Sequence, residues 1–596
     1  MVFQTPTRRN PLPLIVAAVV GLVAVVVVYL VLKPSAAEQH AADRGNCVSL
    51  QVVASSEKAG LLGELARQYN ASGRTFGGKC ADLKVASKSS GGAMQALATG
   101  WDESVEGVPA PQVWSPAGSS WVGLLRQRAA ATDKGNLVPD GKPASIAQTP
   151  LVLAMPKPMA EALGWPNKPI GWSDVLGLTT NPLGWGAVGH PEWGSFKLGK
   201  TNPNLSTSGL NATVAAYFAA TGRSGDLTEN DLADPKVLSF VAGVESGVVH
   251  YGDTTLTFLA NFADADAHGR GMNYVSAVAV EEKSVYDYNQ GNPTGDPAQV
   301  GKGRKPAVPL VAVYPKEGTL LSDNPWVVLS SASDEQKAAA ADVLAYLQAP
   351  EQQKRFTDAA FRSFEGRAGD PVSQANGLLP DQKFTVLDPP PPAVIGKALT
   401  TWETQRKRAR VLLVLDVSGS MAADGKLEMA KRAALAALDR FAPDDEVGVW
   451  SFSDVQPGAT TPYTELVPVG AVSAGRERMK QVINSLHAEG GTALYATARA
   501  AQQKLLSTVD PHRINAVVLL TDGKNEYPAD NDLDRLIRDL DANNLENSVR
   551  VFTIAYGAQA DLETLKKISG ASRAAAYDAT KASTIESVMI NVVSNF

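Results

Sequence analysis

From Arg410 to the C-terminus, short apolar runs alternate with helical stretches, and this alternation constrains the fold more than any other feature of the chain. Strands that alternate with helices build a parallel sheet covered on both faces. The pattern therefore predicts a doubly wound α/β domain over residues 409–596, and such domains bind ligands beyond the carboxyl ends of their strands. The strand-like runs are VLLVLDV, EVGVWSFS, INAVVLLTD and SVRVFTIAYG, and helical spacing covers 427–441, 476–487, 493–508, 532–543 and 581–594.

Oxygen-bearing side chains stand at the ends of these predicted strands. VLLVLDVSGSM ends in Asp416, Ser418 and Ser420; Thr492 follows a Gly-Gly pair, and Asp522 directly follows a buried strand. Taken singly, Asp-Gly is usually a turn and DxSxS is often a helix cap. Taken together, two carboxylates and three hydroxyls form a hard-oxygen set suited to Mg²⁺ or Mn²⁺. The three loops therefore predict a metal site.

With DVSGSM, DEVGVWSFS, GGTALY and TDGK, residues 409–596 resemble the von Willebrand factor type A domain family. The resemblance implies a metal-ion-dependent adhesion site, in which the three hydroxyls are direct ligands and the two carboxylates act mostly through bound water. It further implies an open coordination position that accepts an Asp or Glu from a partner protein. Because no nucleophile–base pair stands near these residues, we expect binding and no catalysis.

The first large region also begins as an α/β domain. CVSLQVVAS and ADLKVAS have strand character and flank the helical AGLLGELARQYN. The region also contains the stretches VVASS, SKSSGGAMQAL, PQVWSPAGSSW and KTNPNLSTSGLNA. With these matching stretches, it resembles the bacterial extracellular solute-binding protein family, of the type that binds molybdate or sulfate. The resemblance implies a two-lobed, periplasmic-binding-protein-like domain, which we assign to residues 47–375.

Candidate solute contacts in this domain lie in Ser, Thr and Gly turns at the starts of helices. Free backbone N–H groups and the helix dipole favour an anion there, so a small oxyanion is the expected ligand. Ser and Thr are also the usual helix N-caps, so a structural role is the alternative. Lys88 and Lys200 would add charge or be solvated. The candidate contacts are Ser55, Ser56, Ser89, Ser90, Gly91, Ser206, Thr207, Ser208 and Gly209.

The N-terminal part of the chain contains a candidate membrane span. Leu14 to Leu32 is a run of 19 residues without a charge, close to the ~20 that cross a bilayer. Arg8 and Arg9 precede it, which predicts a cytoplasmic segment 1–13, a single transmembrane helix at 14–32 and an extracytoplasmic remainder. The alternative is a cleaved signal peptide, because PSAA follows the run.

Two connecting segments complete the expected organisation. A polar linker spans 33–46, and a Pro-rich linker and helix span 376–408, where four consecutive prolines favour a semi-rigid spacer. Cys47 and Cys80 are the two cysteines of the chain. In an oxidising compartment such a pair predicts one disulfide, and two free thiols are the alternative.

Composition narrows the class of function. The net charge of −6 comes without a concentrated basic run, which argues against a nucleic-acid-binding protein. Six histidines without an HExxH motif argue against a zinc enzyme. We therefore expect a non-enzymatic binding protein on the cell membrane that holds a partner protein through a metal ion. The alternative is an anion-uptake receptor of an ABC-type transporter with an accessory interaction domain.

Overall fold

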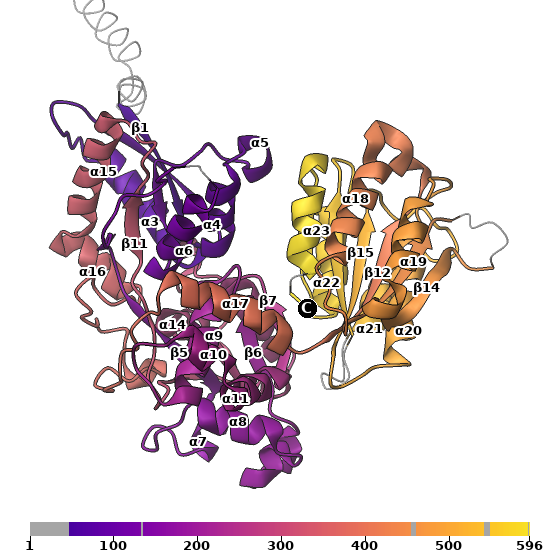
Figure 1. The fold of residues 1–596 in the computed structure, drawn as a ribbon, viewed down its shortest axis with the longest axis horizontal. Helices are drawn as coiled ribbons and strands as arrows, with labels where there is room; N and C mark the ends of the chain where they lie inside the picture. The colour runs from indigo at the N-terminus through magenta and orange to yellow at the C-terminus, as the bar shows by residue number, and fades with distance from the viewer. Residues whose placement is uncertain (1–46, 133–134, 455–459, 542–548, 594) are drawn as a thin grey trace, which may run out of the picture.

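The computed structural model describes residues 47–132, 135–454, 460–541, 549–593 and 595–596. These residues form three β-sheets with helices packed around them (Figure 1). The predicted transmembrane helix at 14–32, the segment before it and the linker after it lie outside the described residues. Within the part that the structure describes, no helix is both long and apolar enough to cross a membrane.

The first lobe is built on a sheet in which β1 pairs in parallel with both β2 and β3. Alternate residues of β1 face opposite layers: Val52 packs with α3 and α15, and Val53 packs with α4 and α6. The strands, in sheet order, are β2 (Ala81–Ser87), β1 (Val48–Ala54), β3 (Val113–Ser115), β11 (Pro325–Val328) and β4 (Ala144–Ser145). The helices are α3 (Ser56–Ala71), α4 (Ser90–Thr99), α5 (Glu103–Glu106), α6 (Ser119–Ala130), α15 (Asp334–Leu347) and α16 (Pro350–Asp358).

The second lobe has a mixed sheet whose parallel part consists of β8, β6 and β7. The strands, in sheet order, are β10 (Leu321–Ser322), β5 (Thr149–Pro156), β8 (Ala277–Glu281), β6 (Leu198–Thr201) and β7 (Val248–Gly252), and β9 (Leu310–Val313) pairs with β5. The helices are α7 (Lys157–Ala162), α8 (Trp172–Thr180), α9 (Thr207–Thr221), α10 (Glu229–Ala233), α11 (Pro235–Ser246), α12 (Thr255–Ala267), α13 (Gly271–Tyr274) and α14 (Glu282–Asn289). The chain passes from the first lobe to the second between β4 and β5 and returns between β10 and β11, so the first lobe contains two separate parts of the sequence.

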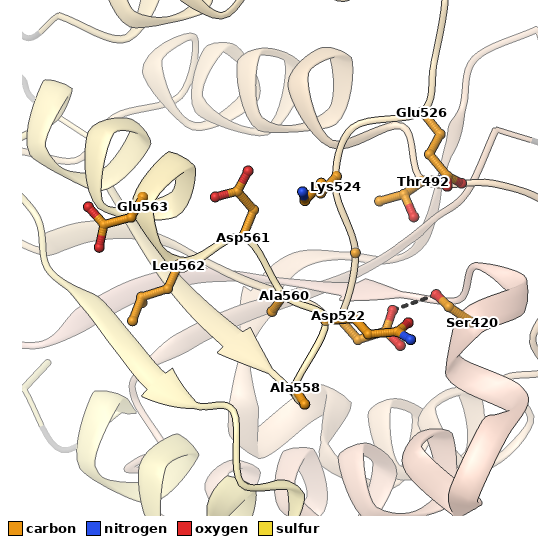
Figure 2. Close-up of a pocket in the computed structure, with 12 residues that line it drawn as sticks. Ser420, Thr492, Asp522, Lys524, Glu526, Ala558, Ala560, Asp561, Leu562 and Glu563 are labelled. Carbon is orange, nitrogen blue, oxygen red and sulfur yellow. Dashed lines mark hydrogen bonds between the residues drawn. The ribbon is translucent and has the colours of Figure 1, made fainter.

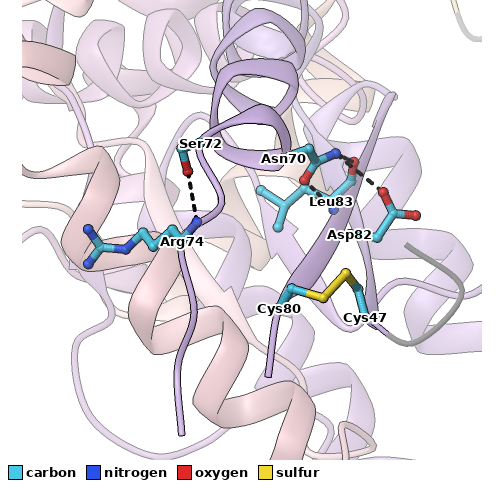
Figure 3. The surroundings of a disulfide bond; sticks show 7 residues. All are labelled: Cys47, Asn70, Ser72, Arg74, Cys80, Asp82 and Leu83. Carbon is cyan, nitrogen blue, oxygen red and sulfur yellow. Dashed lines mark hydrogen bonds between the residues drawn. A yellow bond between two sulfur atoms is a disulfide. The ribbon is translucent and has the colours of Figure 1, made fainter. Parts of the chain in front are cut away.

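A disulfide joins Cys47 to Cys80 at the edge of the first sheet (Figure 3). Cys47 precedes β1 and Cys80 precedes β2, and the backbone N–H of Val48 donates to the Cys80 carbonyl at 2.9 Å. The cross-link therefore fastens the starts of two neighbouring parallel strands to each other.

Within the predicted Pro-rich linker and helix at 376–408, the helix is α17 (Pro392–Gln405). Its apolar residues recur three and four positions apart, and one side of the helix is therefore buried against α6, α9 and α10. Trp402 packs edge-on against Tyr251 of β7, with ring centroids 5.0 Å apart. The connection is thus part of the solute-binding-like domain.

The C-terminal domain has a six-stranded sheet covered on both faces, as predicted. Helices α18, α19 and α23 pack on one face, and α20, α21 and α22 pack on the other. The sheet order is β14 (Tyr463–Ala471), β13 (Glu446–Phe452), β12 (Ala409–Asp416), β15 (Ile514–Thr521), β16 (Arg550–Tyr556) and β17 (Ala576–Ala579). The helices are α18 (Lys426–Leu438), α19 (Val472–Asn484), α20 (Leu494–Leu506), α21 (Leu533–Leu540), α22 (Leu562–Ala571) and α23 (Ile585–Val593).

The two domains meet where the C-terminal end of the chain lies beside the second lobe (Figure 1). Tyr251 of β7 donates its N–H to the Asn595 carbonyl at 3.3 Å. The guanidinium of Arg573, which is 4% exposed, lies 3.1 Å from the Asp264 carboxylate of α12. Arg270 reaches in the other direction and pairs with Asp541 at 2.7 Å. Charged pairs therefore join the domains from both sides of the contact.

Candidate metal site

The carboxyl ends of β12 and β15 place the predicted metal residues at one edge of the sheet. β12 ends at the fully buried Asp416, and Asp522 immediately follows β15. Past the strand end, Gly419 donates its N–H to the Gly490 carbonyl at 2.7 Å, which fastens the first loop to the loop that carries Thr492. Three loops distant in sequence thus converge at this edge.

Short contacts connect four of the five predicted residues. The hydroxyl oxygens of Ser418 and Ser420 are 3.1 Å apart, and Ser420 donates to Asp522 Oδ1 at 2.6 Å (Figure 2). Asp416 Oδ1 accepts from the Ser418 N–H at 2.8 Å. Thr492 joins Ser420 and Asp522 in the lining of one pocket of about 730 Å³. The structure therefore brings all five residues to one place.

These distances fit a small divalent cation. Mg²⁺ binds oxygen at about 2.0–2.1 Å in an octahedron, which places neighbouring ligand oxygens about 2.9 Å apart. The hydroxyl and carboxylate oxygens of Ser418, Ser420 and Asp522 are separated by 2.6 and 3.1 Å. The residues present thus match Mg²⁺ or Mn²⁺ in both oxygen type and spacing.

Lys426, the first residue of α18, also belongs to the site, although no motif in the sequence pointed to it. Its ammonium forms an ion pair with Asp522 Oδ2, while Oδ1 of the same carboxylate faces Ser420. Tyr556 donates to the Lys426 carbonyl at 3.0 Å and holds the start of the helix in place. A lysine ten residues after Asp416 has no distinctive spacing, because its approach depends on how α18 folds back over the strand ends.

The Gly-Gly pair before Thr492 is needed for close packing. Gly490 has a φ of +77°, a conformation that favours glycine. A Cβ on Gly491 would lie 2.8 Å from the Asp454 carboxylate, which accepts the Gly491 N–H. Glu526 also donates its backbone N–H to the Thr492 carbonyl at 2.7 Å. The threonine loop is therefore held from both sides.

Burial raises the pKa of Asp416 to about 6, although hydrogen bonds from Ser418 and Thr521 act in the opposite direction. Thr521 donates to Asp416 Oδ2 at 2.5 Å, so both carboxylate oxygens have a protein donor. Asp416 therefore positions the serine loop, and its charge depends on mildly acidic pH.

Three of the predicted solute contacts, Ser90, Gly91 and Thr207, lie at the boundary between the two lobes. Gly91 of the first lobe donates its N–H to the Leu205 carbonyl of the second at 2.9 Å. Thr207 donates to the Ser90 hydroxyl at 3.2 Å. Of the other candidates, Ser55 precedes α3 and Ser56 begins it, Ser89 precedes α4, and Ser206, Ser208 and Gly209 surround the start of α9.

The two glycines in this set approach protein backbone. A Cβ on Gly91 would lie 2.1 Å from the Asn204 carbonyl of the opposite lobe, and one on Gly209 would lie 2.2 Å from the Thr201 carbonyl. The lysines are also engaged: Lys88 pairs with Glu106, and the buried Lys200 pairs with Glu245. Lys200 is therefore neither solvated nor available to a solute.

Comparison with known proteins agrees with both halves of this fold. The family described as bacterial extracellular solute-binding protein matches residues 50–362. The chain belongs to this family. A von Willebrand factor type A domain follows it and matches residues 411–590, which includes all five predicted metal residues.

Individual relatives match one half of the chain at a time. The uncharacterized protein sll0103 of Synechocystis sp. is 31% identical over 170 residues, which span 28% of this chain and 37% of that protein. A von Willebrand factor type A structure from Catenulispora acidiphila is 24% identical to this chain. The match covers 32% of this chain and 42% of that protein, with a TM-score of 0.26. The sulfate-binding protein SubI from Mycobacterium tuberculosis is 15% identical to this chain. The match covers 55% of this chain and 89% of SubI, with a TM-score of 0.32.

We expect Mg²⁺ or Mn²⁺ to raise the melting temperature of the chain, and Asp416→Ala to abolish that rise. A ligand that binds the folded state, at a free concentration of about 100 times its Kd, adds about 2.7 kcal/mol to the free energy of unfolding. Thermal unfolding with metal and with EDTA measures the effect. Asp445→Ala is a matched control, since Asp445 is equally buried but accepts hydrogen bonds from Arg406 and Ala409 at the start of β13. This control should melt earlier yet keep the metal-dependent rise; equal responses of wild type and Asp416→Ala to metal would refute the site.

Metal affinity should fall as the pH drops through about 6, because a proton on Asp416 competes with the cation. Below that pKa, affinity should decrease by up to about tenfold per pH unit as this one carboxyl is protonated. Calorimetric titration of Mg²⁺ across the range from about pH 7.5 to about pH 5 tests this. An affinity that stays constant through this range would contradict the role given to Asp416.

Lys426→Met should enlarge the metal-dependent rise in melting temperature. Without metal, the substitution leaves the Asp522 carboxylate buried without its cationic partner, which lowers stability. With metal, the loss of a nearby positive charge strengthens cation binding. Thermal unfolding in EDTA and in saturating Mg²⁺ separates the two effects, and a rise no larger than that of wild type would show that Lys426 does not compete with the cation.

Proposed function

We propose that this chain is a membrane-anchored extracytoplasmic protein whose von Willebrand factor A domain binds a partner protein through a divalent metal ion. The observation that carries the proposal is the convergence of Asp416, Ser418, Ser420, Thr492 and Asp522 at the edge of the sheet. These oxygens lie beside an open pocket large enough to admit a side chain of another protein.

The residues of the site have distinct roles in this proposal. Ser418, Ser420 and Thr492 would hold the ion directly, and Asp416 and Asp522 would orient these hydroxyls or their bound waters. A bound Mg²⁺ supplies an electrophilic centre that accepts an oxygen ligand. Because hydroxyls contribute no charge and Lys426 offsets Asp522, an Asp or Glu from a partner is the matching further ligand.

Sequence and fold support the proposed membrane-anchored, extracytoplasmic location. The uncharged run from Leu14 to Leu32 follows two arginines, which favours an N-terminal anchor with the folded domains outside. The Cys47–Cys80 disulfide suits an oxidising compartment. The matched family is itself described as extracellular.

The pocket chemistry favours binding over catalysis. Among its described lining residues there is no histidine or cysteine, and the acids present include Glu526, Asp561 and Glu563. Asp561 caps α22 through the Thr564 N–H at 3.1 Å, which is a structural role. The alternative of an anion-uptake receptor has less support, because Lys88 and Lys200 are already paired with glutamates.

A partner captured from membranes of the source cells should be released by EDTA and recaptured with Mg²⁺. Immobilised wild type, Asp416→Ala and Asp445→Ala chains allow the comparison, with bound protein quantified by mass spectrometry. Capture should be lost in Asp416→Ala and kept in Asp445→Ala, because only the first substitution removes a residue of the site. A partner held equally by all three chains, or in EDTA, would rule out the metal-dependent mode.

A further inference from the structure

The carboxyl edges of two sets of parallel strands face each other where the two lobes meet. In the first lobe β1 leads into α3 and β2 leads into α4; in the second, β6 leads into α9 and β8 ends at Glu281. Hydrogen bonds from Gly91 to Leu205 and from Thr207 to Ser90 cross between the lobes. We call this region the interlobe site and define it by Ser55, Glu57, Ser90, Ser208, Thr255 and Glu281.

The positive groups near the interlobe site are already committed to protein partners. The fully buried Lys58 ammonium donates to Ser55 Oγ at 2.9 Å, to the Pro116 carbonyl at 2.9 Å and to Asn324 Oδ1 at 3.0 Å. An ammonium has three protons, so these contacts use all of them. Burial also lowers the pKa of Lys58 to about 7. Lys58 therefore fastens α3 to the segments at Pro116 and Asn324 and offers nothing to an oxyanion.

Glu281 differs from the other buried acids of the second lobe. Its side chain is 3% exposed, and the side-chain hydrogen bond it receives from the described residues is a long one, 3.4 Å from the Thr255 hydroxyl. A buried carboxylate without a close partner is costly. Three neighbouring acids in the same lobe each have a basic partner: Glu245 with Lys200, Glu282 with Arg362, and Asp287 with Lys283.

Hydroxyl groups and a second acid surround Glu281. Thr255 is 2.8 Å from Ser208, and Ser208 is 3.0 Å from Ser206, so a chain of hydroxyls leads to the carboxyl. Burial and repulsion from Glu57 of the opposite lobe raise the pKa of Glu281 to about 8, while the hydrogen bond from Thr255 and the charge of Lys283 act in the opposite direction. Lys58 and Lys283 lie near enough to act on this charge, but Lys58 donates to Ser55 and Lys283 pairs with Asp287, so among the described residues neither forms an ion pair with Glu281.

We propose that the interlobe site binds a solute with an amine group, whose ammonium is held by the Glu281 carboxylate and by the hydroxyls of Thr255 and Ser208. An ammonium has three donors and a positive charge, which match these acceptors. The expected oxyanion is the wrong sign for this site. The proposal is independent of the metal-dependent function of the other domain.

Calorimetry of the purified chain in EDTA tests the ligand class. Putrescine and ethanolamine serve as cationic probes, and sulfate and molybdate serve as anionic ones. EDTA removes divalent ions, so failure of the metal site does not affect the result. We expect an amine to bind, and Glu281→Gln to weaken it on the order of tenfold or more, the size of a charged hydrogen bond. Glu282→Gln is the matched control, because this adjacent buried glutamate pairs with Arg362 and should leave amine affinity unchanged.

Proton release provides a second readout that a purely structural glutamate would not give. At neutral pH an ammonium must displace the proton from Glu281, so the binding enthalpy should vary with the ionisation enthalpy of the buffer, and Glu281→Gln should remove this variation. Glu281→Gln resembles the protonated carboxyl in shape and charge, so it should fold. Binding of sulfate or molybdate, binding of Ca²⁺ in a titration without EDTA, amine binding unaffected by Glu281→Gln, or no binding of any probe would each overturn the proposal.

Discussion

In a parallel sheet covered on both faces, the side chains along each strand are buried. Polar side chains that can meet a ligand therefore stand at the edge where the strands end. β12 has apolar residues facing helices on each side, and its contribution to the candidate site is Asp416, the last residue of the strand. The same constraint acts on β1 and on β8, which lead to Ser55 and Glu281. Both candidate sites of this molecule therefore follow from the way its strands are buried.

Buried charges then decide what each edge can hold. At the candidate metal site Lys426 pairs with one oxygen of Asp522 and leaves the other facing Ser420. Near the lobe boundary Lys200 pairs with a glutamate and Lys58 donates to neutral oxygens, while Glu281 has no ion-pair partner among the described residues. Two sites built on similar strand ends thus differ in the charge they present, and fold similarity alone does not identify their ligands.

The sequence predicted the order of domains, the strands of the C-terminal sheet core and the convergence of its metal residues, because buried parallel strands are continuous apolar runs with polar ends. It missed β14, an edge strand with largely exposed or half-exposed residues and little apolar pattern. It also missed Lys426 and Glu281, since both become significant through residues distant in sequence. The resemblance to anion-binding proteins drew attention to serines and glycines, and the charge balance around them appears only in three dimensions.

The cross-link at the start of the first sheet has a mechanical consequence. Cys47 is the first residue that the structure describes, and its bond to Cys80 ties it to β2 as well as to β1. A pull on the N-terminal side is therefore divided between two strands at once, and β1 cannot peel away from its neighbour residue by residue. If the chain is anchored on its N-terminal side, as proposed, tension from a partner bound to the C-terminal domain would pass through this cross-link.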